Sequence, residues 1–325
     1  MDKLDIWTLN YRKEYNIYAT FLEKIQIIIL VHMLKLDYCN ILVMGCYFMK
    51  PLDNFNEIVI SEENAKKYLN DIEFKEFKLM SNEEKNQKLR NLLEKPIFEF
   101  TVINELYFRS KWAECVNILM GDNRLNLLEI ASGDADMIPQ MMARNNINSH
   151  YITANMNKEL NSSLTNKTKD LPIRITLIDD DAANIKKYLG EEQVDIIAFQ
   201  HSVNDIVQAI LCEDEGIDTV YSNWIEILPK MIEIMKREDK NNSLEESVKL
   251  PFLNLIKSLL GVLKKDGFII INHYMFQFDL ELGYPEDIWE NFVLITRKWL
   301  SELEECEEFA IDGFNEQWWI FLKKN

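Results

Sequence analysis

The chain has 325 residues, of which 47% are hydrophobic, and can bury one large core or two of ordinary size. Lys and Arg number 36 against 54 Asp and Glu, which gives a formal net charge of −18 at pH 7. Because this charge repels phosphate backbones and anionic lipid surfaces, we expect neither nucleic acid nor a membrane as a partner.

The five cysteines are scattered, odd in number and without paired CxxC spacing, so no zinc site is expected. We interpret them as reduced thiols of a cytoplasmic protein. The chain begins without the basic and then apolar stretch of a secretory signal. The apolar run Ile25–Leu34 contains Gln26 and His32 and falls short of the roughly 20 residues that a membrane span needs. A buried helix is the better interpretation of this run.

The first third of the chain is predicted to be helical. Apolar residues recur at helical spacing from Trp7 to Met33. Ser81 and Glu84 have the spacing of a capping box, and Pro96 ends the helix that they begin. We therefore expect a helical N-terminal region of about one hundred residues.

From Leu125 onward, short aliphatic runs alternate with amphipathic stretches, which is typical of βαβ units. The predicted strands are Asn126–Ala131, Tyr151–Asn155, Ile173–Ile178, Val194–Gln200, Phe268–His273, Glu308–Gly313 and Gln317–Lys323. The last two are too close for a helical crossover and should form an antiparallel hairpin at the sheet edge. The prediction is an α/β fold with a seven-stranded, mostly parallel sheet, helices on both faces and a domain boundary near residue 100.

The first strand ends in Leu-Leu-Glu-Ile-Ala-Ser-Gly-Asp-Ala-Asp at 127–136, followed by a predicted helix. This resembles the first motif of class I, Rossmann-like S-adenosylmethionine-dependent methyltransferases. In that family an acidic residue, a Gly-x-Gly-x-Gly turn and the helix start hold the methionine part of the cofactor. The matching positions are Glu129, Ala131, Ser132, Gly133 and Ala135, with two alanines in place of glycine. Taken alone, this motif could also be an ordinary strand-to-helix turn.

The next two strands carry further family positions. Asn155 and Met156 follow the second strand, where the family usually has an acid that binds the ribose hydroxyls. A carboxylate restored by Asn155→Asp is therefore expected to strengthen cofactor binding. After the third strand, Asp180, Asp181 and Ala182 resemble the adenine contact, with Asp181 accepting from the exocyclic amine. Alternatively, the aspartates cap the following helix.

The fourth strand ends in Gln200 and His201, from which the family presents residues to the transferring methyl. The fifth follows a Leu-Lys-Lys-Asp-Gly-Phe turn at 263–268, which resembles the leucine-lysine-proline-glycine-glycine turn of the family. The resemblance extends over Leu125–Asn325 and implies S-adenosyl-L-methionine as the cofactor.

Methyl transfer needs alignment, exclusion of water and, for some acceptors, removal of a proton. His201 is the first candidate for a general base because its unperturbed pKa lies near 6.5. Asp205, four residues on, could fix the tautomer of His201 across one helical turn. His273, after the fifth strand, is the next candidate. Alternatively, His201 only caps the helix, and no metal is predicted.

The leading hypothesis is a cytoplasmic S-adenosylmethionine-dependent methyltransferase with a small-molecule substrate. A catalytically silent interaction protein with the same fold and a protein methyltransferase are the alternatives. The helical region over residues 1–100 would form a lid or a dimerisation face over the substrate site. Adaptable side chains for such a face are Met33, Met44, Phe48 and Met49, for which a core role is equally open.

Overall fold

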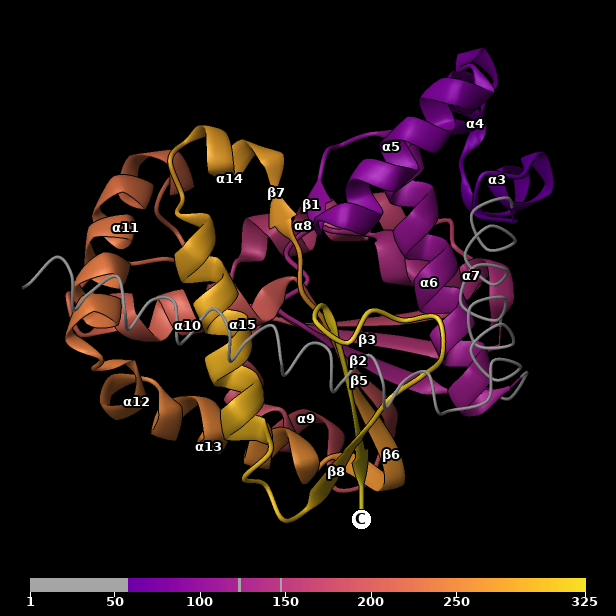
Figure 1. Ribbon diagram of the computed structural model, residues 1–325. Coiled ribbons are helices and arrows are strands. Elements are labelled where there is room, and N and C mark those ends of the chain that lie inside the picture. The colour runs from indigo at the N-terminus through magenta and orange to yellow at the C-terminus, as the bar shows by residue number, and fades with distance from the viewer. Residues whose placement is uncertain (1–57, 122–123, 147) are drawn as a thin grey trace, which may run out of the picture. The chain divides into compact units, whose positions relative to one another are not determined.

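The computed structural model describes residues 58–121, 124–146 and 148–325 (Figure 1). Residues 56–325 form one compact unit. The helical pattern of Trp7–Met33, with its apolar run, and the predicted lid methionines lie outside the described residues. Within the described part, no helix is both long and apolar enough to cross a membrane.

One seven-stranded sheet organises this unit, in the order β4-β3-β2-β5-β6-β9-β8. The strands are β2 (Asn126–Ile130), β3 (His150–Ala154), β4 (Arg174–Ile178), β5 (Val194–Gln200), β6 (Leu263–Asn272), β8 (Cys306–Phe309) and β9 (Trp319–Lys324). All neighbours are parallel except β9, which is antiparallel to both β6 and β8. The predicted α/β fold with a terminal antiparallel hairpin is confirmed.

Two strand boundaries differ from the prediction. β6 already begins at Leu263, so the predicted turn lies within the strand, where the register with β5 shifts between Val194 and Ile196. Asp266 has a φ of 59°, and a Cβ on Gly267 would lie 2.9 and 3.0 Å from two backbone oxygens, so this irregularity requires glycine. The hairpin loop is also longer than predicted, because β8 ends at Phe309.

Helices cover the sheet on both faces (Figure 1). They are α3 (Glu62–Tyr68), α4 (Asp71–Leu79), α5 (Asn82–Glu94), α6 (Val102–Met120), α7 (Met137–Asn145), α8 (Lys158–Thr168), α9 (Lys186–Leu189), α10 (Ser202–Glu213), α11 (Trp224–Asn241), α12 (Leu244–Ser247), α13 (Lys249–Leu260), α14 (Gln277–Glu281) and α15 (Glu286–Leu300), with the 3-10 helix η1 (Ala182–Asn184). Every second residue of a strand points to the same face of the sheet. On one face, residues such as Phe199 and Ile271 belong to a buried apolar cluster with side chains of α10, α11, α13 and α15. On the other face, Trp112 of α6 packs edge-to-face on Trp319.

The helices before the sheet belong to the same compact unit. Ser81 accepts a hydrogen bond from the Glu84 amide and begins α5, which ends before Pro96 as predicted. Arg109 of α6, 4% exposed, forms a two-pronged ion pair with Glu73 of α4, at 2.8 and 3.1 Å. A buried guanidinium needs such partners, so this contact ties α4 to α6.

A second, two-stranded sheet was not predicted. It pairs β1 (Ile97–Phe98) in parallel with β7 (Met275–Phe276). The Phe98 and Tyr274 rings lie 5.4 Å apart, and the Met275 amide donates to the Pro96 carbonyl at 2.8 Å. Two residues per strand are too few for a sequence period, so tertiary contacts create this pairing. It places the start of α6 beside the carboxyl end of β6.

Candidate functional site

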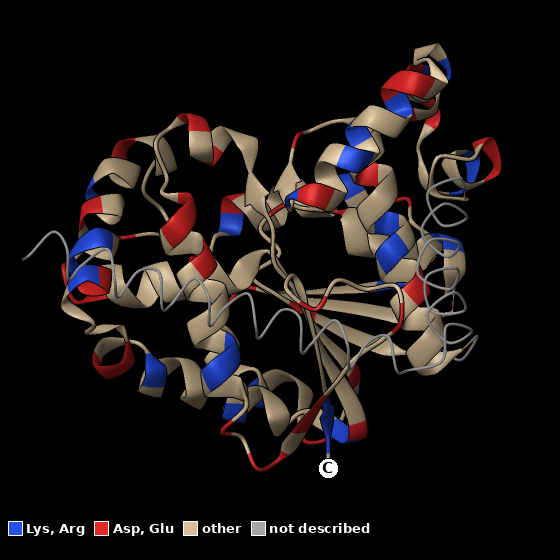
Figure 2. Cartoon of the chain, in the orientation of Figure 1, with Lys and Arg blue, Asp and Glu red and all other residues tan. Residues whose placement is uncertain are grey.

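The strands that cross the core carry few charged residues (Figure 2), and Glu129 in β2 is an exception. The Glu129 side chain is 1% exposed and accepts a 2.7 Å hydrogen bond from the Tyr151 hydroxyl. Burial raises the pKa of Glu129 to about 8 from its ordinary 4.5, opposed by the Tyr151 hydrogen bond. At neutral pH this carboxyl is therefore mostly protonated.

This raised pKa predicts a stability effect. Folding favours the protonated acid, so the contribution of Glu129 to stability is fully present below pH 4.5 and is lost as the pH rises through about 8. Glu129→Gln keeps an acceptor for Tyr151 and removes the titration. We expect thermal unfolding midpoints measured over a pH series to fall less for this variant than for the parent between these values. Parallel curves would contradict a buried, protonated Glu129.

The turn after β2 has a positive φ at two positions that match glycines of the family motif. Ala131 and Gly133 have φ of 53° and 57°, in the region where glycine is usual. The Ala131 amide donates to the Ala154 carbonyl at 3.2 Å, which holds the alanine in this conformation. A Cβ added to Gly133 would meet only Leu160, at 3.7 Å, so the turn has room on that side. Ser132 and Ala135 close it through a 3.0 Å backbone hydrogen bond.

Asn155 follows β3, and its side chain contacts this turn. It is 5% exposed. Its Oδ1 accepts from the Gly133 amide at 3.1 Å, and its Nδ2 lies 3.0 Å from the Gly133 carbonyl and 3.1 Å from Ser132 Oγ. The neighbouring Met156 is 48% exposed, and its carbonyl accepts from the Tyr221 hydroxyl at 2.9 Å. The structure thus separates a buried amide from an exposed thioether at the end of β3.

The aspartates after β4 divide their roles. Asp180 accepts from Asn184 and from the Tyr188 hydroxyl, at 3.0 and 2.7 Å, and these hydrogen bonds keep its pKa below the usual value. Asp181 is exposed and caps η1 by accepting from the Ala183 amide at 2.8 Å. Ala182, buried, begins that helix. One carboxylate oxygen of Asp181 therefore caps η1, as the alternative interpretation predicts. A contact between the other oxygen and adenine stays a prediction.

For Asp181→Ala we expect roughly ten-fold weaker binding of S-adenosylhomocysteine, the demethylated product, because a hydrogen bond to a charged group is lost. Calorimetry measures the affinity, and thermal unfolding of the same variant reports the cap. A lower unfolding midpoint with unchanged affinity would leave Asp181 only its capping role.

His201 joins β5 to α10 in a left-handed conformation, with a φ of 63°. Its ring stacks on Tyr274 at 4.8 Å and meets Phe276 edge-on at 4.5 Å. Nδ1 lies 2.5 Å from the Tyr274 carbonyl oxygen. A carbonyl only accepts, so Nδ1 carries a proton, and in the neutral form of the ring Nε2 has the lone pair. Within the described chain, no hydrogen bond joins Asp205 to His201, so the Tyr274 carbonyl is what fixes this tautomer.

The carboxyl groups of Asp205 and Asp279 interact electrostatically with His201. Burial raises the pKa of Asp205, and the nearby charge of His201 lowers it by a smaller amount. Burial also raises the pKa of Asp279 to about 6, with His201 lowering it and Asp205 raising it. Asp279 was not among the predicted site residues. It lies in α14, far along the chain from α10, and its helix carries no motif that could have identified it.

His273 is buried at 1% exposure after β6. Burial, followed by the nearby charges of His201 and Arg297, lowers its pKa to about 3. Such an imidazole is a weak proton acceptor at neutral pH, so the structure favours His201 over His273 as a base.

Buried polar atoms without a hydrogen-bond partner in the described part of the chain gather around the ends of β5 and β6. They are Gln200 Oε1, Ser202 Oγ, His273 Nε2 and the side-chain amides of Asn204 and Asn272. The Gln200 amide nitrogen contacts Met137 Sδ at 2.9 Å and the Tyr274 hydroxyl at 3.3 Å. Unpaired buried groups are costly, so their concentration here fits a polar ligand or ordered water at the carboxyl ends of the strands.

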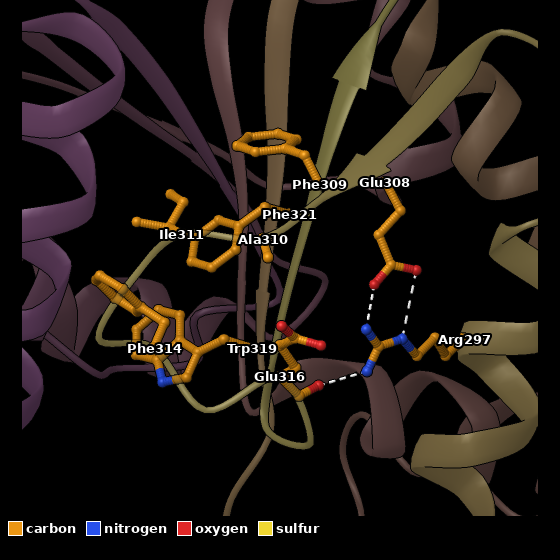
Figure 3. Close-up of a pocket in the computed structure, with 9 residues that line it drawn as sticks. All are labelled: Arg297, Glu308, Phe309, Ala310, Ile311, Phe314, Glu316, Trp319 and Phe321. Carbon is orange, nitrogen blue, oxygen red and sulfur yellow. Dashed lines mark hydrogen bonds and ion pairs between the residues drawn. The ribbon is translucent and has the colours of Figure 1, made fainter. Parts of the chain in front are cut away.

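A cavity of about 230 Å³ lies elsewhere, beside the β8–β9 hairpin (Figure 3). Its lining is Arg297, Glu308, Phe309, Ala310, Ile311, Phe314, Glu316, Trp319 and Phe321. Arg297 is paired with Glu308 and donates to the Glu316 carbonyl, so its charge is already compensated. None of the predicted site residues lines this cavity, and we assign it no ligand.

A mostly parallel seven-stranded sheet that ends in an antiparallel hairpin is the fold that the resemblance to class I methyltransferases predicts. No family model and no curated protein matches the chain.

Similar solved structures include a provisionally described S-adenosylmethionine-dependent methyltransferase from Methanococcus maripaludis, with 14% identity, a TM-score of 0.40 and coverage of 65% of this chain and 83% of that one. Another is a provisionally described rRNA methylase from Clostridium thermocellum, with 12% identity, a TM-score of 0.39 and coverage of 66% and 94%. A SAM-dependent methyltransferase from Aquifex aeolicus has 10% identity, a TM-score of 0.39 and coverage of 65% and 88%. At these identities the likeness concerns the fold alone.

Proposed function

We propose that this chain is a cytoplasmic methyltransferase that uses S-adenosyl-L-methionine to methylate a small molecule. The observation that carries the proposal is the open turn at Ala131–Ala135, at the same edge as the unpartnered polar atoms that end β5 and β6. Open α/β sheets bind ligands at this edge, outside the carboxyl ends of their strands. The first amides of α7, which no side chain caps, supply donors for a carboxylate.

The cofactor supplies an electrophilic methyl group on a sulfonium sulfur. Held by the Ala131–Ala135 turn, the cofactor would give this methyl group to a lone pair of the acceptor and leave as S-adenosylhomocysteine. In this proposal His201 Nε2 receives the proton of an acceptor that must lose one. Tyr274 orients the imidazole, and Phe276 shields it from water.

Calorimetry with S-adenosylmethionine and S-adenosylhomocysteine tests the proposal. We expect both to bind at one site per chain. Binding of neither would contradict the cofactor assignment and leave the catalytically silent alternative. Transfer of a labelled methyl group to the small-molecule or to the protein fraction of a cell extract then separates the two acceptor classes. The net charge of −18 would favour a basic partner if the acceptor were a protein.

The helical lid or dimerisation face stays part of this proposal for residues 1–100. Of that region, α3 to α5 are described. Removing the first 55 residues is expected to leave cofactor affinity within a few-fold, because residues 56–325 form a compact unit that contains the whole turn.

A further inference from the structure

Both ends of the Asn155 side-chain amide are hydrogen-bonded to the protein. Its Oδ1 accepts from the Gly133 amide at 3.1 Å. Its Nδ2 has three acceptors, at 3.0 Å from the Gly133 carbonyl, 3.1 Å from Ser132 Oγ and 2.9 Å from Asn161 Oδ1. An amide has only two N–H hydrogens, so three acceptors already exceed its donors. Asn155 is 5% exposed, both of its N–H hydrogens are engaged, and its oxygen already accepts from the Gly133 amide, which leaves one lone pair of that oxygen as its remaining site.

From this geometry we propose that Asn155 is a positioning residue that holds the Ala131–Ala135 turn, and that it does not contact the ribose. The inference rests on the proposed function, since the turn would hold the methionine part of the cofactor. Asn155 binds both backbone polar groups of Gly133, one through each end of its amide. It thereby fixes the orientation of the two peptide groups that flank Gly133. The φ of Gly133 is 57°, a left-handed conformation that residues other than glycine rarely adopt.

The role explains why an amide stands where the family usually has an acid. A carboxylate only accepts, so at position 155 it could bond to the Gly133 amide but not to the Gly133 carbonyl. It would also face Asn161 Oδ1 and place a buried charge near Asp179, to which Asn161 donates. Asn155→Asp should therefore weaken the turn, which reverses the expectation from sequence that a carboxylate would strengthen cofactor binding.

Asn161 of α8 completes the arrangement. Its Nδ2 donates to the Asn155 carbonyl at 3.2 Å, and its Oδ1 accepts from the Asn155 side chain. The two amides thus bond to each other through both side-chain and backbone atoms. Because Asn161 is 5% exposed, this pair is shielded from water, and the orientation of the Asn155 amide is set from the side of α8.

Two ligands separate a positioning role from a ribose contact. S-adenosylhomocysteine has both the nucleoside and the amino acid, whereas 5′-methylthioadenosine has the same nucleoside without the amino acid. If Asn155 holds the turn, Asn155→Asp should weaken S-adenosylhomocysteine binding by about ten-fold or more and change 5′-methylthioadenosine binding less than about three-fold. Both affinities are measured by calorimetry on the full chain, at a temperature where circular dichroism shows the variant folded.

Asn157→Asp is the matched control, since it adds the same charge two residues away and a carboxylate still caps α8. It should leave both affinities within about two-fold. If Asn155→Asp does not fold, Asn155→Ala removes the hydrogen bonds to Gly133 without adding a charge. It should weaken the binding of S-adenosylhomocysteine and leave that of 5′-methylthioadenosine nearly unchanged.

Stronger binding of both ligands to Asn155→Asp would restore the ribose role and overturn the inference, as would equal losses for both ligands. If the parent chain binds neither ligand, the proposed function fails, and the inference fails with it. A parent that binds both ligands while Asn155→Asp and Asn155→Ala match it would overturn the positioning role alone.

Discussion

Gly133→Trp is expected to abolish S-adenosylhomocysteine binding while the fold persists. A Cβ at Gly133 would meet only Leu160, at 3.7 Å, so the indole would extend into the space that the cofactor is proposed to occupy. Calorimetry on the folded variant should show no heat of binding at ligand concentrations that saturate the parent.

The φ of 57° at Gly133 means that any side chain there also strains the backbone. Gly190→Trp is the matched control because Gly190 has a φ of 76°, has no neighbour within 4 Å of an added Cβ, and precedes the opposite, amino end of β5. This control should bind normally. Unchanged affinity in a folded Gly133→Trp variant would remove the turn from the proposed site.

His201→Ala is expected to lower turnover by about 10²–10⁴-fold with cofactor affinity nearly unchanged, which is the usual contribution of a general base. The reason is geometric: Nδ1 bonds to the Tyr274 carbonyl, so Nε2 can receive the proton of the acceptor. Single-turnover kinetics on the true acceptor, together with calorimetry, measures the two quantities separately.

The control is His150→Ala, since His150 lies at the amino end of β3 and bonds to Thr176 at 2.8 Å. It should reduce stability but not the rate of methyl transfer. Turnover of His201→Ala within a few-fold of the parent would show that the acceptor needs no base and that His201 only connects β5 to α10. A large loss of cofactor affinity would instead indicate a binding role.

Most of the sheet could be predicted from the sequence because a buried parallel strand needs a short aliphatic run, whatever surrounds it. β2, β3, β4 and β5 each lie within about one residue of the predicted range. The terminal hairpin was predictable for a similar reason, since few residues separate its strands. The candidate turn was identifiable because Gly133 and its small neighbours follow a strand directly.

The strands, and the edge of the sheet where polar residues gather, could be predicted from the sequence. The contacts that those polar residues make could not, because they depend on tertiary packing. Asn155 has the right position for a ribose ligand, but its amide bonds to Gly133 and Ser132 in the turn that follows β2, the strand that pairs with β3. Likewise, Tyr274 rather than Asp205 orients His201, because β6 ends next to β5. Hydrogen-bond partners depend on which segments meet in space, and spacing along one chain does not encode that.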